Sequence, residues 1–281
     1  MKAGWEQYTC EMGVTYACEM AQLRLWLQRT SQGWQTAFRH EAQEGFTPLQ
    51  ACNEVPPDLE WQRFVTPLNT AAVRLVPVLP DRSVVSRPEG RIEIAPRHQG
   101  LFLVTIPVWM RVQTGASPSV ALGDYPTVLL SKTWFGHPSE EGEIGYALTT
   151  RARQEMAALT DIEGRAICPV LIENHTDEAL VFAQLLLSVR HMSVYQTADG
   201  KLWTNECNLG YTGSVFPASV TFGRKAPKQA RGAKLLSGPR VVPSGRLTAR
   251  VIAGTIFKQP NNHDDGAVTV KNSKLSTVLS D

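Results

Sequence analysis

The stretch AQLRLWLQR, residues 21–29, alternates apolar and polar side chains along its length. Leu23, Leu25 and Leu27 fall on one face of an extended chain, and the residues between them fall on the other. This period of two predicts a half-buried strand. The turn SQG then leads into WQTAFRH, residues 34–40, so the two segments together predict a β-hairpin.

The same alternation recurs along the chain and predicts further strands. RIEIAP and LFLVTIPVWMRV, joined by RHQG at 97–100, predict a second hairpin. ICPVLIEN and ALVFAQLLLSV flank the turn HTDE, and MSVYQT and KLWTNE flank ADG, whose Asp199-Gly200 pair is typical of tight turns. Two later segments add strands, SVFPASVTFG at 214–223 and GRLTARVIAGTIF at 245–257.

Helical patterns are weak by comparison. RARQEMAALTDIEG, residues 151–164, and LEWQRFVTPL, residues 59–68, are the two candidates. The 18 prolines and 21 glycines lie between strand-like segments and disfavour alternating βα units. We therefore expect an all-β or mainly β protein, an antiparallel β-sandwich or jelly roll with few short helices.

The domain organisation is less sharply marked. The prolines near residue 56 suggest that residues 1–56 form an N-terminal hairpin extension. Residues 57–258 would form the sandwich body, with a possible division into two halves near residue 160. The polar stretch 259–281 lacks sustained periodicity and predicts a flexible tail.

Several features of the whole chain favour a cytoplasmic protein. Residues 1–10 contain no apolar segment typical of a secretory signal, and the most apolar run, 179–189, is too short to span a bilayer. Five cysteines without a Cys-x-x-Cys pair fit a reducing compartment, where most of them would be buried as small apolar side chains.

Positive charge is concentrated in one segment. Residues 221–250 carry eight basic side chains and no acidic one, although the net charge of the chain is only +2. Four of these, Arg224, Lys225, Lys228 and Arg231, are candidate anion-binding residues. Phe222 is the sole aromatic there, whereas single-strand nucleic-acid sites interleave aromatics, so nucleic acid is not the expected partner. A solvated loop with balancing charge is the alternative.

A second candidate site is LSKTWFGHPSEEGEIGYALTTRAR, residues 130–153. Strand-like flanks predict a hairpin with carboxylates at its tip, where binding loops commonly lie. The candidate binding residues are Trp134, His137, Glu141, Glu143, Arg151 and Arg153. The arginines could instead pair with the glutamates across the strands in a purely structural role. A third interpretation uses the Glu140–Glu143 carboxylates for glycoside hydrolysis.

Motifs of the common catalytic and metal sites are missing from the sequence. The six histidines form neither His-x-His nor HExxH, and no GxSxG elbow, GxGxxG or GxxxxGK[ST] loop occurs. We therefore expect no metal, no cofactor and no catalytic residue. A non-enzymatic binding or regulatory module is the favoured function, with self-association through a strand edge left open.

Longer motifs resemble a known family. TWFGHPSEEGEIGYALTTRAR, RAICPVLIEN, SVYQTADGKLWT and the Arg87-Pro88-Glu89 segment are similar to an uncharacterised prokaryotic family, domain of unknown function 432. The resemblance runs from about residue 78 to about Trp203. It implies a cytoplasmic bacterial or archaeal protein without an established reaction, and a small mechanosensitive channel as a partner.

Overall fold

The computed structural model describes residues 5–66, 70–88, 92–115, 119–136, 142–150, 164–182, 185–213 and 218–242. Within these ranges the chain forms five β-sheets. Their helical content is limited to two short 3-10 turns, η2 (Val189–His191) and η3 (Lys228–Ala230). The predicted mainly β fold is confirmed.

The hairpin predicted from residues 21–40 is present, and its two strands are the longest of a three-stranded sheet. Its strands, in order, are β2 (Thr15–Thr30), β3 (Gly33–Ala51) and β4 (Gln62–Val65). Leu23, Leu25 and Leu27 are buried, as the alternation predicts. Trp26, on the opposite face, is buried as well, with the Arg24 guanidinium 5.0 Å from the centre of its ring. Both faces of this strand are therefore covered.

The helix expected at residues 59–68 does not form. Residues 62–65 are the strand β4, which pairs antiparallel with residues 33–36 of β3. Phe64 packs against the core from this strand. A short helix here would leave the edge of β3 unpaired, and the helix propensity of the segment is too weak to outweigh that ladder of hydrogen bonds.

Gly33 makes the approach of β4 possible. Its φ is +143°, and a Cβ at this position would lie 2.1 Å from the carbonyl oxygen of Phe64. Replacing Gly33 with alanine is therefore expected to destabilise the protein, by about 1–3 kcal/mol from backbone strain alone. Chemical denaturation measures the effect. Gly13→Ala is the matched control, because Gly13 has φ +78° but open space around it; equal losses in the two variants would contradict the steric argument.

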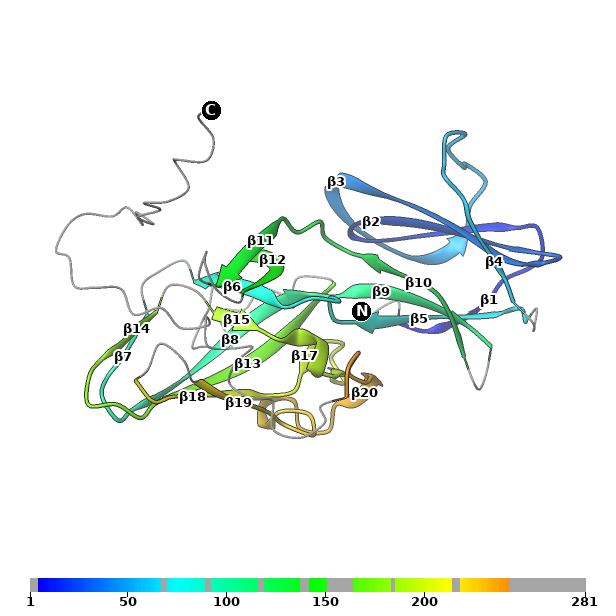
Figure 1. The fold of residues 1–281 in the computed structure, drawn as a ribbon. Coiled ribbons are helices and arrows are strands. Elements are labelled where there is room, and N and C mark those ends of the chain that lie inside the picture. Colours follow the sequence, from blue (N-terminus) through cyan, green and yellow to red (C-terminus); the bar gives the residue numbers. More distant parts are fainter. Residues whose placement is uncertain are drawn as a thin grey trace, which may run out of the picture.

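A second sheet faces the long hairpin. It is antiparallel throughout, in the order β1 (Gln7–Thr9), β5 (Ala72–Val78), β9 (Trp109–Thr114) and β10 (Val120–Pro126). The hydroxyls of Thr36 and Tyr125 join the two sheets across a distance of 2.7 Å. Figure 1 shows β2 and β3 lying over β5 and β9 as two layers. Residues 5–51 are thus packed directly on the rest of the chain.

The remaining strands form a second layered region. One sheet has the order β11 (Lys132–Gly136), β12 (Gly142–Thr150), β6 (Val84–Pro88) and β15 (Leu185–Leu187). The largest sheet has the order β19 (Ala218–Phe222), β18 (Cys207–Tyr211), β13 (Arg165–Asn174), β17 (Leu202–Thr204), β16 (Val194–Gln196) and β20 (Lys234–Ser237), and β8 (Gln99–Pro107) also pairs with β13. A two-stranded sheet, β7 (Ile92–Ile94) with β14 (Leu180–Phe182), lies at one end (Figure 1).

Not every pairing follows the sequence prediction. The ADG hairpin, β16–β17, and the β11–β12 hairpin are confirmed. The hairpin expected around RHQG is wrong, because β7 pairs with β14 while β8 pairs with β13. Three pairs, β6–β12, β13–β17 and β13–β18, are parallel rather than antiparallel. Alternation specifies which side chains face the core but does not specify which strand lies alongside.

One continuous hydrophobic core runs through both layered regions. Between β2 and the sheet of β5 and β9 it contains Leu25, Leu75 and Val112, and next to β13 it contains Val170 and Val104. Four predicted features lie outside the described residues: the helix at 151–164, apart from Gly164, the strand at 245–257, the tail at 259–281, and the proposed division near residue 160.

Candidate functional site

The basic loop, residues 223–234, follows β19 and ends with Lys234, the first residue of β20; it is an ordered segment of the surface. Ala230 is 1% exposed and packs with Leu103, Tyr195 and Trp203 in a small separate hydrophobic cluster. Ala226 and Ala233 pack against the same cluster from either side. Because alanine side chains are small, the loop can lie close to the sheet at these three positions.

The start of the basic loop is held by a buried amide. Asn205, which is 4% exposed, donates from Nδ2 to the carbonyl oxygen of Gly223 and accepts a hydrogen bond of 2.6 Å from the backbone N–H of Ser193. The backbone N–H of Gly223 in turn donates to the carbonyl oxygen of Glu206. These bonds restrict the conformations that the loop can adopt.

The cations of the basic loop point outward. Arg224, Lys225, Lys228, Arg231 and Lys234 are all exposed. In the described part of the chain none of the five forms a side-chain hydrogen bond or an ion pair. The predicted solvated loop and the predicted anion-binding surface therefore share one geometry, in which the backbone that carries the cations is held in place and the described residues supply no counter-charge to them.

The second predicted site is only partly described. Trp134 lies on β11 and is 51% exposed, directly opposite Ile144 on β12, which is also exposed. Glu143 is half-buried and pairs with residue 135 in the ladder. The other predicted members, His137, Glu140, Glu141, Arg151 and Arg153, lie outside the described residues.

The structure does not bring the two predicted sites together. The basic loop adjoins the largest sheet, whereas Trp134 and Glu143 belong to the sheet of β6 and β12. Figure 1 places β11 and β20 toward different edges of the molecule. Each surface therefore has to be judged as a binding site by itself.

A partly buried charge cluster escaped the sequence prediction. Asp124 on β10 accepts two hydrogen bonds from Arg111 on β9, at 2.6 Å from Nε and 2.7 Å from Nη2, and a third from Nη1 of Arg240. Arg240 also donates from Nε to the carbonyl oxygen of Leu79 at 2.5 Å, and its guanidinium lies 5.4 Å from the centre of the Trp109 ring. This cluster attaches residues 237–241 to the sheet of β5, β9 and β10.

The electrostatics of the cluster fit a structural clamp, that is, a set of ion pairs that holds two segments of the chain together. Burial raises the pKa of Asp124, but hydrogen bonds from Arg111 and Arg240 outweigh burial and leave that pKa below its usual value. Nearby, Tyr146 donates to Asp81 at 2.9 Å, and burial together with this bond raises the pKa of the phenol to about 12. Asp124 therefore keeps its negative charge and Tyr146 keeps its proton throughout the neutral pH range. Neither group has the pKa near neutrality that acid–base catalysis favours. The only advance signal was a pair of opposite charges, Arg111 and Asp124, on neighbouring strand-like segments.

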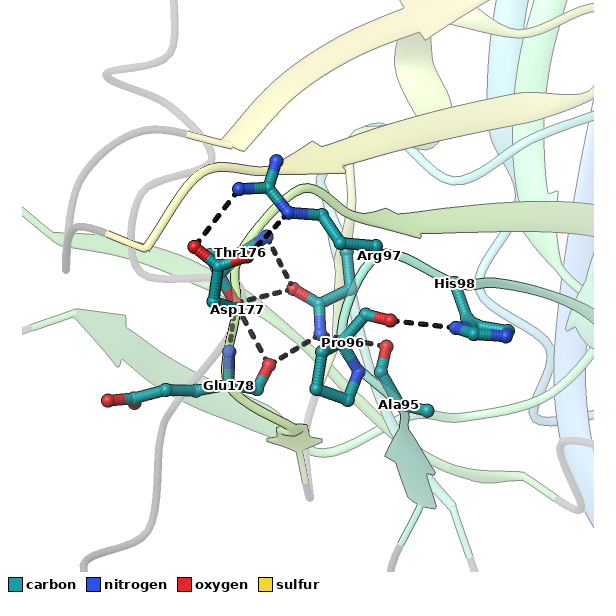
Figure 2. A network of polar contacts seen from close by, with 8 residues as sticks. Ala95, Pro96, Arg97, His98, Thr176, Asp177 and Glu178 are labelled. Carbon is teal, nitrogen blue, oxygen red and sulfur yellow. Dashed lines mark hydrogen bonds and ion pairs between the residues drawn. The ribbon is translucent and has the colours of Figure 1, made fainter.

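A second polar network lies at the C-terminal end of β13 and is shown in Figure 2. Asn174, which is 1% exposed, donates to the carbonyl oxygens of Ile94, Ala95 and Glu178 and accepts from Thr176. Next to it, Arg97 of the turn between β7 and β8 forms a two-point ion pair with Asp177, at 2.9 and 3.1 Å. The polar groups satisfy one another, so the network joins two turns rather than offering a ligand site.

Most of the cysteines are buried, as the sequence predicts. Four cysteines, Cys10, Cys18, Cys168 and Cys207, are buried and free, and burial raises the pKa of each thiol. Cys52 is partly exposed. Among the described residues, no three His, Cys, Asp or Glu side chains are grouped as metal ligands. None of the helices in those ranges has the length and hydropathy needed to cross a bilayer.

These observations define a mainly β protein with layered sheets, an ordered basic loop and an exposed hairpin. The chain belongs to the family described as Protein of unknown function (DUF432), whose model matches residues 4–256. The resemblance indicated by its motifs is thereby confirmed. Neither a curated protein nor a solved structure matches the chain.

Proposed function

We propose that this protein is a non-enzymatic binding module, and that its basic loop binds an acidic segment of a partner protein. The observation that carries the proposal is the set of five exposed cations on a loop whose alanines are packed against Tyr195 and Trp203. An ordered loop loses little conformational entropy when it binds, which favours association. Free, buried thiols are typical of proteins in a reducing compartment, which supports a cytoplasmic location.

A protein partner fits the loop better than a nucleic acid. Phe222, the aromatic nearest the cations, is half-buried and packs against the core, and Tyr195 and Trp203 are buried beneath the loop. No aromatic face of these three is therefore free to stack on bases. Lysine and arginine side chains without partners still attract the carboxylates of an acidic segment, mainly by raising the association rate.

Charge reversal tests this proposal. The variant R224E/K225E/K228E is expected to lose about tenfold or more of the affinity for the partner, because attraction at three positions becomes repulsion. Partners are captured from a lysate of the native organism on the tagged protein, after nuclease treatment, and the affinity of the purified partner is then measured at low and moderate salt. Binding should weaken as salt rises, since exposed charges are screened.

The matched control is R63E/R74E/R87E, which makes the same change in net charge at three exposed arginines outside the basic loop. We expect this control to retain the partner. Equal loss in both variants would show that only net charge matters and would overturn the role of the basic loop. Retention of every partner by the R224E/K225E/K228E variant, or capture that nuclease abolishes, would overturn the proposal itself.

A further inference from the structure

A concave pocket of about 320 Å³ lies on the long β2–β3 hairpin, on a part of the molecule that the proposed function does not use. Its volume is at the lower end of the range for small-molecule sites, about 300–1,000 Å³. Three charged side chains line it, Glu19, Arg24 and Glu54, together with the polar side chains of Thr47, Gln50 and Asn53. The lining is thus suited to a small, strongly polar molecule.

The pocket exists because the hairpin is interrupted twice. The register of β2 against β3 shifts between Ala17 and Glu19 and again between Ala21 and Leu23. At the second shift the partner residue jumps from Gly45 to His40, and Ala21 has a φ of +50°. Bulges of this kind bend a strand and re-aim its side chains, and they are common next to binding sites.

The bend brings together two charges that a regular strand would separate. Glu19 and Arg24 are five residues apart, so in an unbroken strand they would point to opposite faces. In this protein Oε1 of Glu19 lies 3.3 Å from Nε of Arg24. The hydroxyl of Thr47 donates to Oε2 of the same carboxylate at 3.2 Å.

Contacts outside the pocket hold the bend in place. Gln22, the residue of β2 at the second shift, donates its backbone N–H to the carbonyl oxygen of Thr127, and its side-chain oxygen accepts from the N–H of Leu129. The guanidinium of Arg24 rests over the ring of the fully buried Trp26. Glu19 and Arg24 are therefore positioned before any ligand binds.

Several polar groups of the pocket lack a hydrogen-bond partner among the described residues. Nε of Arg24 is shielded from solvent yet forms no hydrogen bond, because its contact with Glu19 is poorly aligned. Within the described residues, the Nη atoms of Arg24, the carboxylate of Glu54 and the side-chain amides of Gln50 and Asn53 have no hydrogen-bond partner. One guanidinium and one carboxylate thus remain available on the same pocket.

We propose that this pocket binds a small zwitterion of the α-amino acid class. The ligand carboxylate is held by the guanidinium of Arg24, whose planar arrangement of N–H groups suits two-point binding. The ligand ammonium is held by the carboxylates of Glu54 and Glu19. A simple anion would face those two carboxylates, and a simple amine would leave the Nη groups of Arg24 unused, so a ligand carrying both charges fits this lining best.

Titration calorimetry on the full-length protein tests the site, first with the twenty standard amino acids as probes. At least one is expected to bind with saturation at millimolar or lower concentration. The binding amino acid is then compared with the matching amine that lacks its carboxylate and the matching acid that lacks its ammonium. Each is expected to bind about tenfold or more weakly, as the loss of one charge-assisted contact implies.

Variants separate this pocket from the rest of the surface. R24Q and E54Q are each expected to weaken binding about tenfold or more, whereas R63Q, at an exposed arginine of β4, should leave it unchanged. Thermal unfolding of each ligand-free variant checks that the hairpin is intact, and E54Q keeps the test decisive should R24Q unfold. Absence of saturable binding by any amino acid, equal binding of the matching amine, or unchanged binding in E54Q would overturn the proposal. None of these outcomes depends on the basic loop.

Discussion

Replacing Asp124 with alanine is expected to destabilise the protein by about 3–5 kcal/mol, the range for breaking a buried ion pair by removing one partner. The carboxylate is shared by Arg111 and Arg240, whose side chains are 27% and 16% exposed. Without Asp124 both guanidinium groups stay partly buried without a counter-charge. Equilibrium denaturation in urea measures the change in the free energy of unfolding.

The acid sensitivity of the fold provides a second measurement on Asp124. Since the pKa of Asp124 is lowered in the folded state, its contribution to stability is complete above its unfolded value of about 4 and is lost as the pH falls below that value. The stability of Asp124→Ala should therefore change less between neutral and acidic pH than that of the natural protein. A parallel pH dependence in the two proteins would contradict the clamp.

Asp58→Ala is the matched control for the Asp124 prediction. Asp58 also pairs with an arginine, Arg39, at 2.5 Å, but its side chain is 74% exposed. Exposed pairs gain little because water and salt screen them. A loss for Asp58→Ala comparable to that for Asp124→Ala would show that burial of the cluster is not the cause.

The second large effect is expected at Trp203, beneath the basic loop. Trp203 is 2% exposed and contacts the cluster that holds Ala230. Its replacement by alanine should cost about 3–5 kcal/mol, because it leaves a cavity in a packed interior. The basic loop would also lose its support, so trypsin should cleave after Arg224 to Arg231 faster than in the natural protein.

Two further variants separate packing from general damage. Trp134→Ala removes the same side chain at a position that is 51% exposed, and it should cost far less stability and leave the rate of loop cleavage unchanged. Trp203→Phe keeps most of the apolar volume and should fold even where Trp203→Ala does not. If Trp203→Ala left the basic loop as resistant to trypsin as before, the role of the alanine contacts in ordering the loop would be wrong.

These two sites differ in what could have been foreseen. The basic loop was visible because it lies in a segment, residues 221–250, with eight cations and no acidic residue, and a charge pattern is a property of contiguous residues. Its fixation by Trp203, on β17, and Asn205, just after β17, was not visible, since these residues belong to another part of the sequence. The Asp124 cluster required Arg240, which lies 116 residues further along the chain.

The sequence by itself determined the class of fold, the first hairpin and the ADG hairpin. In those segments the information is local: alternation at Leu23, Leu25 and Leu27 selects the buried face, and glycine permits the turn at Gly200. Only the tertiary structure decided that β7 and β8 do not pair, that β6 and β12 run parallel, and that Glu19 meets Arg24. The physical reason is that several partner strands would bury the same alternating side chains, so the choice among them depends on packing across the whole core.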